Sequence, residues 1–201
     1  MAKNDPKEVV EQLTKARISL LLHQPFWGTL ATRLVLRDAT DADWCKTAGT
    51  DGRFFYYNRD FVSKLNKQET IFLFAHEVEH CVYDHMSRKG SRKSSLWNAA
   101  SDFVINWELH EHRVGKMPDP RTSGVEACFD PKYKGMFAEE VYESLAKDPK
   151  KNYPEFDVHM EPGDGKGEPM TEEEVRALRD EISAAVLQAA KVDVGNTPLS
   201  V

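Results

Sequence analysis

The feature that most constrains this chain is an apolar helical pattern, from about residue 67 to 88, that carries titratable side chains inside it. Residues 71–75 (IFLFA) precede the segment 76–80 (HEVEH), and residues 81–82 (CV) follow it. A helix of this composition is mostly buried. Burying imidazole and carboxylate groups is unfavourable unless something compensates for the lost hydration. The pattern therefore predicts a buried helix whose polar side chains together form a site, and not a helix face exposed to solvent.

The spacing inside this segment is H-E-x-x-H. Because residues four apart on a helix share one face, His76 and His80 can bind one Zn²⁺ at about 2.0–2.1 Å without backbone strain. Glu77 points beside the metal, where its carboxylate can take a proton from a metal-held water and pass it to the leaving amine. We therefore expect His76 and His80 as metal ligands and Glu77 as the catalytic general base.

A catalytic zinc site needs a third protein ligand and one open position. His85 lies about 140° around a continuous helix from His80, so it reaches the metal only if the helix breaks before it; otherwise it makes a polar contact at the helix end. Asn98 and Asp102 lie four apart on the next predicted helix, the arrangement of gluzincin-like peptidases. Since a carboxylate binds zinc better than an amide, we expect Asp102 as the ligand and Asn98 as an orienting group. The alternative is that Asp102 only holds a ligand histidine.

Three further residues are candidates for supporting roles. Asn106 continues the helix face of Asn98 and Asp102 and can brace the site. Zinc peptidases usually add a hydrogen-bond donor to the tetrahedral oxyanion, and Tyr133 and His159 are candidates from late loops. The alternatives are that Tyr133 packs in the core and that His159 is solvated.

The rest of the chain predicts an α+β fold that is mostly helical, with a small β-sheet. Turn signals and proline and glycine residues make 152–170 a loop or linker. The expected organisation is a domain over 1–150, a loop over 151–170, and a C-terminal helix and tail over 171–201. Helical patterns cover 6–23, 60–65, 97–113, 137–145 and 171–191, and strand patterns cover 32–36 and 53–57.

Composition excludes several classes of protein. The chain has 27 Lys+Arg against 33 Asp+Glu, a net charge of −6 that argues against nucleic-acid binding by bulk charge. Three cysteines without a CxxC pair argue against disulfide stapling and against an all-cysteine zinc site. The N-terminus lacks the apolar stretch of a signal peptide, and no apolar run approaches the ~20 residues of a membrane span. We expect a cytoplasmic protein that contacts no membrane.

Three further segments of the chain carry recognisable motifs: residues 97–106 (WNAASDFVIN), residues 130–142 (DPKYKGMFAEEVY) and residues 157–159 (DVH). These segments resemble a metallopeptidase family found beside VWA-like domains in bacteria and their phages. The first is similar to the family's W-N-x-A-x-D-x-x-I-N segment, and a histidine such as His85 often follows the family's H-E-x-x-H motif. The second resembles its D-P-x-Y-x-G-M-S-A-E-E-I-Y segment, in which Phe137 replaces a small residue, and the third is a weaker match to its D-D-H motif. The resemblance implies a zincin-like core, zinc-dependent peptide hydrolysis, and a VWA-like or ATPase partner.

Together these patterns predict a zinc metallopeptidase that acts on a protein or peptide substrate. The alternative is a zinc-binding interaction module without catalysis, against which the intact Glu77 argues, because a structural site needs no base. A metal-dependent hydrolase of another bond, such as a nuclease, is disfavoured by the acidic balance of the chain.

Overall fold

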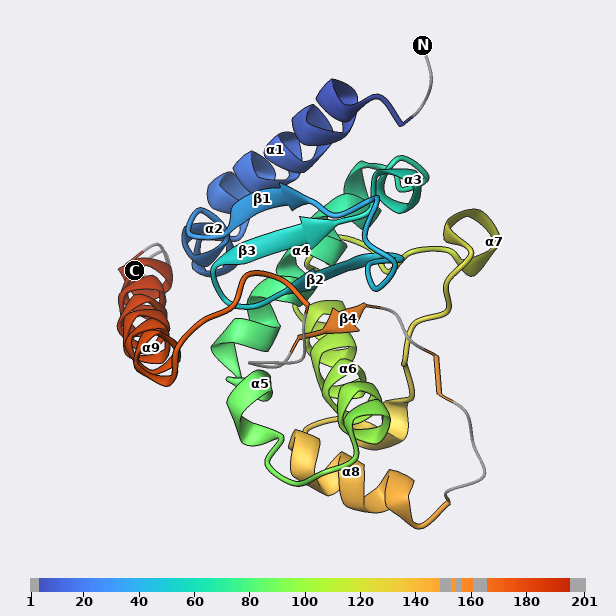
Figure 1. Ribbon diagram of the computed structural model, residues 1–201, viewed down its shortest axis with the longest axis vertical. Coiled ribbons are helices and arrows are strands. Elements are labelled where there is room, and N and C mark those ends of the chain that lie inside the picture. The colour runs from blue at the N-terminus through green and yellow to red at the C-terminus, as the bar shows by residue number, and fades with distance from the viewer. Residues whose placement is uncertain (1–3, 149–152, 155–156, 161–165, 196–201) are drawn as a thin grey trace, which may run out of the picture.

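The computed structural model describes residues 4–148, 153–154, 157–160 and 166–195. These residues form many helices and one small four-stranded sheet, which confirms the prediction of a mostly helical α+β chain (Figure 1). The helices are α1 (Pro6–His23), α2 (Pro25–Ala31), α3 (Arg59–Val62), α4 (Lys67–Val82), α5 (His85–Arg88), α6 (Ser94–Glu111), α7 (Pro120–Ser123), the 3-10 helix η1 (Pro131–Tyr133), α8 (Ala138–Ala146) and α9 (Glu172–Gly195).

The sheet has the order β1-β3-β2-β4, with β1 Val35–Asp38, β2 Ala48–Thr50, β3 Phe54–Tyr57 and β4 Val158–His159. β1 pairs parallel with β3, whereas β2 runs antiparallel to β3 and parallel to β4. Aromatic side chains suit a strand that is buried on both faces, and all four residues of β3 are buried. Because side chains alternate along a strand, Phe55 stacks on Phe74 of α4, whereas Phe54 packs in a cluster on the opposite face.

The main core lies between the sheet and the helices α1, α2 and α4. Asp5 caps α1 through the backbone N–H of Lys7, and Pro6 occupies the first turn, as the sequence predicts. α1 and α2 approach closely at Gly28, where a Cβ atom would lie 2.2 Å from the Cα atom of Leu21. The absence of a side chain at Gly28 is therefore what lets the two helices pack together.

A second cluster of buried side chains joins α6 to α8 and η1. Phe103 of α6 contacts Tyr133 of η1 at 4.8 Å between ring centroids. α9 packs against α2 and α4, and Ala185 and Ala189 on its inner face belong to the main core. Within the part of the chain that the structure describes, no helix is both long and apolar enough to cross a membrane.

Five local features of the structure differ from the sequence-based expectations. Residues 25–31 form α2, because Pro25 starts a new helix, and the first strand covers 35–38 instead of 32–36. Residues 48–50 (Ala-Gly-Thr) give no strand signal in the sequence, yet they form β2. The predicted loop 152–170 contains β4. The predicted continuous helix over 67–88 breaks at Asp84, whose φ is 50°.

Candidate metal centre

α4 presents His76 and His80 one turn apart. Asn66 caps the helix by accepting the backbone N–H groups of Gln68 and Glu69, and Glu69 in turn accepts the N–H of Asn66. The two histidines are 0% and 3% exposed, and their Nε2 atoms lie 3.1 Å apart. The helical spacing that the sequence shows therefore places both imidazoles at one point.

α6 crosses α4 and brings Asp102 to the same point. Asp102 Oδ1 lies 3.7 Å from His76 Nε2 and 3.6 Å from His80 Nε2. The residues before it on α6, Ala99 and Ala100, are small and buried, and they pack in the cluster that joins α6 to α8 and η1. The structure thus brings together His76, His80 and Asp102, the three residues expected as ligands.

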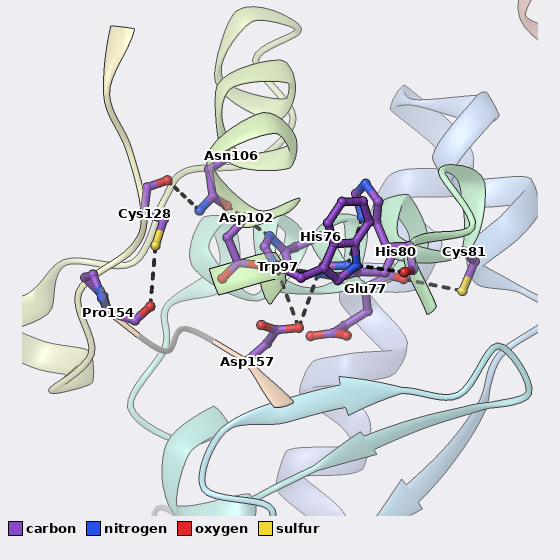
Figure 2. Close-up of polar contacts among 11 residues, drawn as sticks. His76, Glu77, His80, Cys81, Trp97, Asp102, Asn106, Cys128, Pro154 and Asp157 are labelled. Carbon is purple, nitrogen blue, oxygen red and sulfur yellow. Dashed lines mark hydrogen bonds and ion pairs between the residues drawn. The ribbon is translucent and has the colours of Figure 1, made fainter. Parts of the chain in front are cut away.

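Asp157 completes the group from a different part of the fold. It directly precedes β4, and its Oδ2 atom lies 3.2 Å from His80 Nε2 and 3.9 Å from His76 Nε2 (Figure 2). One ligand atom from each of the four residues lies within 4.8 Å of the other three. Asp157 is not among the residues predicted as ligands. The only signal for it in the sequence is the weak similarity of 157–159 (DVH) to a D-D-H motif.

The four side chains fit a divalent cation. Ligand atoms 2.0–2.1 Å from a tetrahedral zinc are separated by roughly 3.3 Å, close to the separations found among these atoms. All four residues are buried. Two buried carboxylates are unfavourable unless their charge is balanced, and a divalent cation would balance it. Imidazole nitrogen and carboxylate oxygen together are a donor set that suits zinc.

The outward nitrogen of His76 is held by Asn106. His76 Nδ1 lies 2.9 Å from Asn106 Oδ1, and Asn106 Nδ2 donates to the carbonyl of Cys128 at 3.0 Å (Figure 2). Because the amide nitrogen is committed to that carbonyl, its oxygen accepts the Nδ1–H of His76. This tautomer leaves Nε2 of His76 as an acceptor toward the metal position. Asn106, which was predicted to brace the site, therefore contacts one of the predicted ligands.

His85 contacts His80 from the side away from the metal position. α4 ends at Val82, and the left-handed backbone of Asp84 turns the chain so that His85 begins α5. The Nδ1 atoms of His85 and His80 lie 3.2 Å apart, while Trp97 Nε1 donates to the carbonyl of His85 at 2.9 Å. The helix break that a metal ligand would require is thus present, but His85 meets Nδ1 of His80, not the Nε2 side.

Glu77 is fully buried on α4 between the two histidines. Figure 2 shows its carboxylate pointing to the side of the helix where Asp157 lies. Cys81, one turn later on the same face, has its sulfur 3.5 Å from the carbonyl oxygen of Glu77. The carboxylate therefore lies beside the group of potential ligands, as expected for a residue that handles protons there.

Glu79, the other glutamate of the segment, faces away from this group. Trp27 Nε1 donates to its carboxylate at 2.5 Å. Burial, together with the nearby charge of Glu108, raises the pKa of Glu79 to about 8. The two glutamates therefore lie in different surroundings although only one residue separates them.

The remaining candidates lie elsewhere. Asn98 is half-buried on α6 and is not part of the four-residue group. Tyr133 is buried in the α6–α8 cluster, where it packs on Phe103. The backbone of His159 belongs to β4, but its side chain lies outside the described part of the structure. Tyr133, one of the two residues predicted as oxyanion donors, therefore packs in the α6–α8 cluster.

Comparison with known proteins gives one match. A family model described as "Putative metallopeptidase domain" matches residues 8–193, which include every residue of the candidate metal centre. No curated protein and no solved structure is significantly similar to the chain.

Proposed function

The chain belongs to this metallopeptidase-domain family, and from that premise we propose that it is a zinc-dependent peptidase. The observation that carries the proposal is the convergence of His76, His80, Asp102 and Asp157. Their two imidazole nitrogens and two carboxylate oxygens lie within 4.8 Å of one another in a buried site beside Glu77. The substrate class is a protein or peptide.

His76, His80 and Asp102 would hold the metal. When bound, zinc acts as a Lewis acid that polarises the scissile carbonyl and lowers the pKa of a water molecule. Asn106 and His85 hold the Nδ1 atoms of the two histidines, so that both Nε2 atoms face the metal position. Zinc is proposed because two imidazoles and a carboxylate from two helices are a donor set found in catalytic zinc sites.

Glu77 is the proposed proton carrier. Its carboxylate would accept a proton from the attacking water and return it to the nitrogen of the leaving amine, so that the residue ends the cycle as it began. Burial in the middle of α4 fixes its backbone position relative to His76 and His80. Because the base is already held in position, less entropy is lost when the base and the substrate come together.

Asp157 favours a second candidate function. Four protein donors are typical of a closed, structural zinc site, whereas a catalytic site keeps one position open. A metal-binding interaction module without catalysis would use all four residues permanently. Under the peptidase proposal, Asp102 is the permanent donor on the long helix α6, and Asp157, beside the two-residue strand β4, leaves the site when substrate binds.

The test is a comparison of two glutamate variants on the same helix. Glu77→Gln should bind one zinc per chain with unchanged affinity and lose hydrolysis of a denatured protein substrate. Glu79→Gln is the matched control, since Glu79 faces Trp27, and it should keep both zinc and hydrolysis. Hydrolysis that survives in Glu77→Gln would contradict the mechanism. Zinc binding without any hydrolysis by the unaltered chain would favour the interaction module.

A further inference from the structure

The candidate metal centre is almost completely buried in the structure. Its four potential ligands and the adjacent Glu77 are each at most 8% exposed. In the proposed reaction the scissile peptide bond must touch both the metal and the base, and an extended substrate needs room on either side of that bond. The structure therefore describes a closed state, and one element of the site has to move before a substrate can enter.

Asp157 and β4 are the part of the centre with the least support. The two histidines and Glu77 lie in the buried part of α4, and Asp102 lies in the buried part of α6. β4, by contrast, has two residues and lies at the edge of the described sheet, where it pairs with β2 (Figure 1). A short edge pairing with few hydrogen bonds opens more readily than a helix packed in the core. Asp157 is thus the donor that can leave without unfolding the site.

β4 covers the edge of the strand that lies against the metal-binding helix. β2 contacts α4, and Thr50 Oγ1 lies 3.9 Å from the sulfur of Cys81. Residues 49–50 of β2 pair in parallel with residues 158–159 of β4. An unpaired strand edge offers backbone N–H and C=O groups to an extended peptide. β4 therefore occupies a position that suits an extended peptide, directly after the carboxylate that reaches the metal position.

The chain beyond β4 is fastened to the face of the sheet opposite to α4. Met160 packs there in a cluster with Tyr56. Gly167 lies at the same place with a φ of 67°, and a Cβ atom on it would lie 2.4 Å from Met160 Cε and 2.9 Å from the hydroxyl of Tyr56. The next residue, Glu168, donates its backbone N–H to this hydroxyl at 3.2 Å. The segment that carries Asp157 is therefore anchored on the sheet at a second place.

Two ion pairs complete this anchor. The carboxylate of Glu168 accepts from Arg37 at 2.6 Å and from Arg53 at 3.1 Å. The three side chains are between 36% and 47% exposed. Exposed ion pairs stabilise only weakly and are screened by salt. The anchor thus has a defined geometry and can be released without disturbing the core.

We propose that residues 157–160 and 166–168, which we call the strap, are an autoinhibitory element. In the closed state the strap places Asp157 at the metal position and covers the edge of β2, and in the open state an extended peptide substrate takes both places. This inference rests on the proposed function. It goes beyond the displacement of one carboxylate, because it makes the ion pairs of Glu168, on the opposite face of the sheet, control access to the metal.

The test measures access to the metal and not turnover. The chain is loaded with Co²⁺ and titrated with imidazole, a neutral ligand whose binding to the metal changes the visible spectrum. Glu168→Gln removes both ion pairs of the strap and keeps all four potential metal ligands. Glu139→Gln is the matched control: Glu139 is 34% exposed and pairs with Arg88 at 2.6 Å, which joins α8 to α5 and does not involve the strap.

Glu168→Gln should bind imidazole about three- to tenfold more tightly than the unaltered chain, since the loss of two exposed ion pairs raises the open fraction by about that factor. Glu139→Gln should match the unaltered chain. Asp157→Ala, which removes the donor of the strap itself, should bind imidazole more tightly than Glu168→Gln. Equal affinities in Glu168→Gln and Glu139→Gln would overturn the inference, and so would an Asp157→Ala chain that binds imidazole no more tightly than the unaltered one.

Hydrolysis of a denatured protein by the same chains, loaded with zinc, separates this inference from the proposed function. If Glu168→Gln binds imidazole more tightly than Glu139→Gln, but neither variant nor the unaltered chain hydrolyses the protein, the strap controls the metal and the proposed function alone fails. If the unaltered chain hydrolyses the protein, and Glu168→Gln neither binds imidazole more tightly nor hydrolyses faster, the strap inference fails and the proposed function stands.

Discussion

The carboxylate of Asp157 lies 3.2 Å from Nε2 of His80, although the two residues come from distant parts of the chain. The same nitrogen lies 3.6 Å from Asp102, which α6 supplies. The site is therefore built from two long helices and from one residue at the start of a two-residue strand. This difference in support leads to the first prediction.

Asp102→Asn and Asp157→Asn should affect metal binding differently. Asp102→Asn removes the donor held by α6 and should abolish both zinc binding and hydrolysis. Asp157→Asn should weaken zinc binding only on the order of tenfold, the effect of a supporting residue, and should keep hydrolysis. A dye-competition titration measures the affinity, and the visible spectrum of the Co²⁺-loaded chain reports the coordination. Equal loss of metal in both variants would contradict the peptidase proposal and support a closed site.

His85→Ala should weaken zinc binding by about 10–100-fold, because His80 loses the partner of its Nδ1 atom. His85→Asn is the matched variant, since its Oδ1 atom can take the place of Nδ1 and accept the same hydrogen. It should recover most of the affinity. Competition with a chelating dye measures both. If the two variants bind zinc equally well, His85 does not position His80.

Gly28→Ala should destabilise the fold by about 1–3 kcal/mol or more, because the added Cβ would lie 2.2 Å from the Cα of Leu21. Thr29→Ala, the next residue of α2, is the control and should have a much smaller effect. Urea unfolding of the two variants gives the comparison. A Gly28→Ala chain as stable as the unaltered one would show that α1 and α2 do not pack as described.

Cys45 should resist thiol reagents in the folded chain. Burial, with a smaller effect of the charge of Glu77, raises its pKa to about 12. At pH 8 only roughly one thiol in ten thousand would then be ionised, and the rate of alkylation should rise about tenfold per pH unit below pH 12. Alkylation with iodoacetamide, mapped by mass spectrometry, measures this rate. Labelling of native Cys45 as fast as in urea would be inconsistent with the burial.

The parts of the site that lie on regular helices could be predicted from the sequence. Helical periodicity fixes which residues share a face, so His76 and His80 on α4 and Asp102 and Asn106 on α6 were identifiable before their contacts were known. The helix N-terminus at Pro6 was identifiable for a similar reason, since its cap is local in sequence.

The contribution of Asp157 could not be predicted in this way. It lies in an irregular segment, and its position depends on the pairing of β4 with β2, a strand of Ala-Gly-Thr without apolar alternation. The position of His85 depends on the helix break at Asp84, where neither glycine nor proline marks the turn. Aspartate is one of the few residues that adopt the left-handed conformation readily, but an aspartate alone does not predict it.

The metal content of the purified chain tests the central claim most directly. After dialysis against zinc and then against metal-free buffer, plasma mass spectrometry should find about one zinc per chain, and His76→Ala and His80→Ala should each contain almost none. A folded chain that retains no metal, or a His76→Ala chain that retains as much as the unaltered one, would contradict the account.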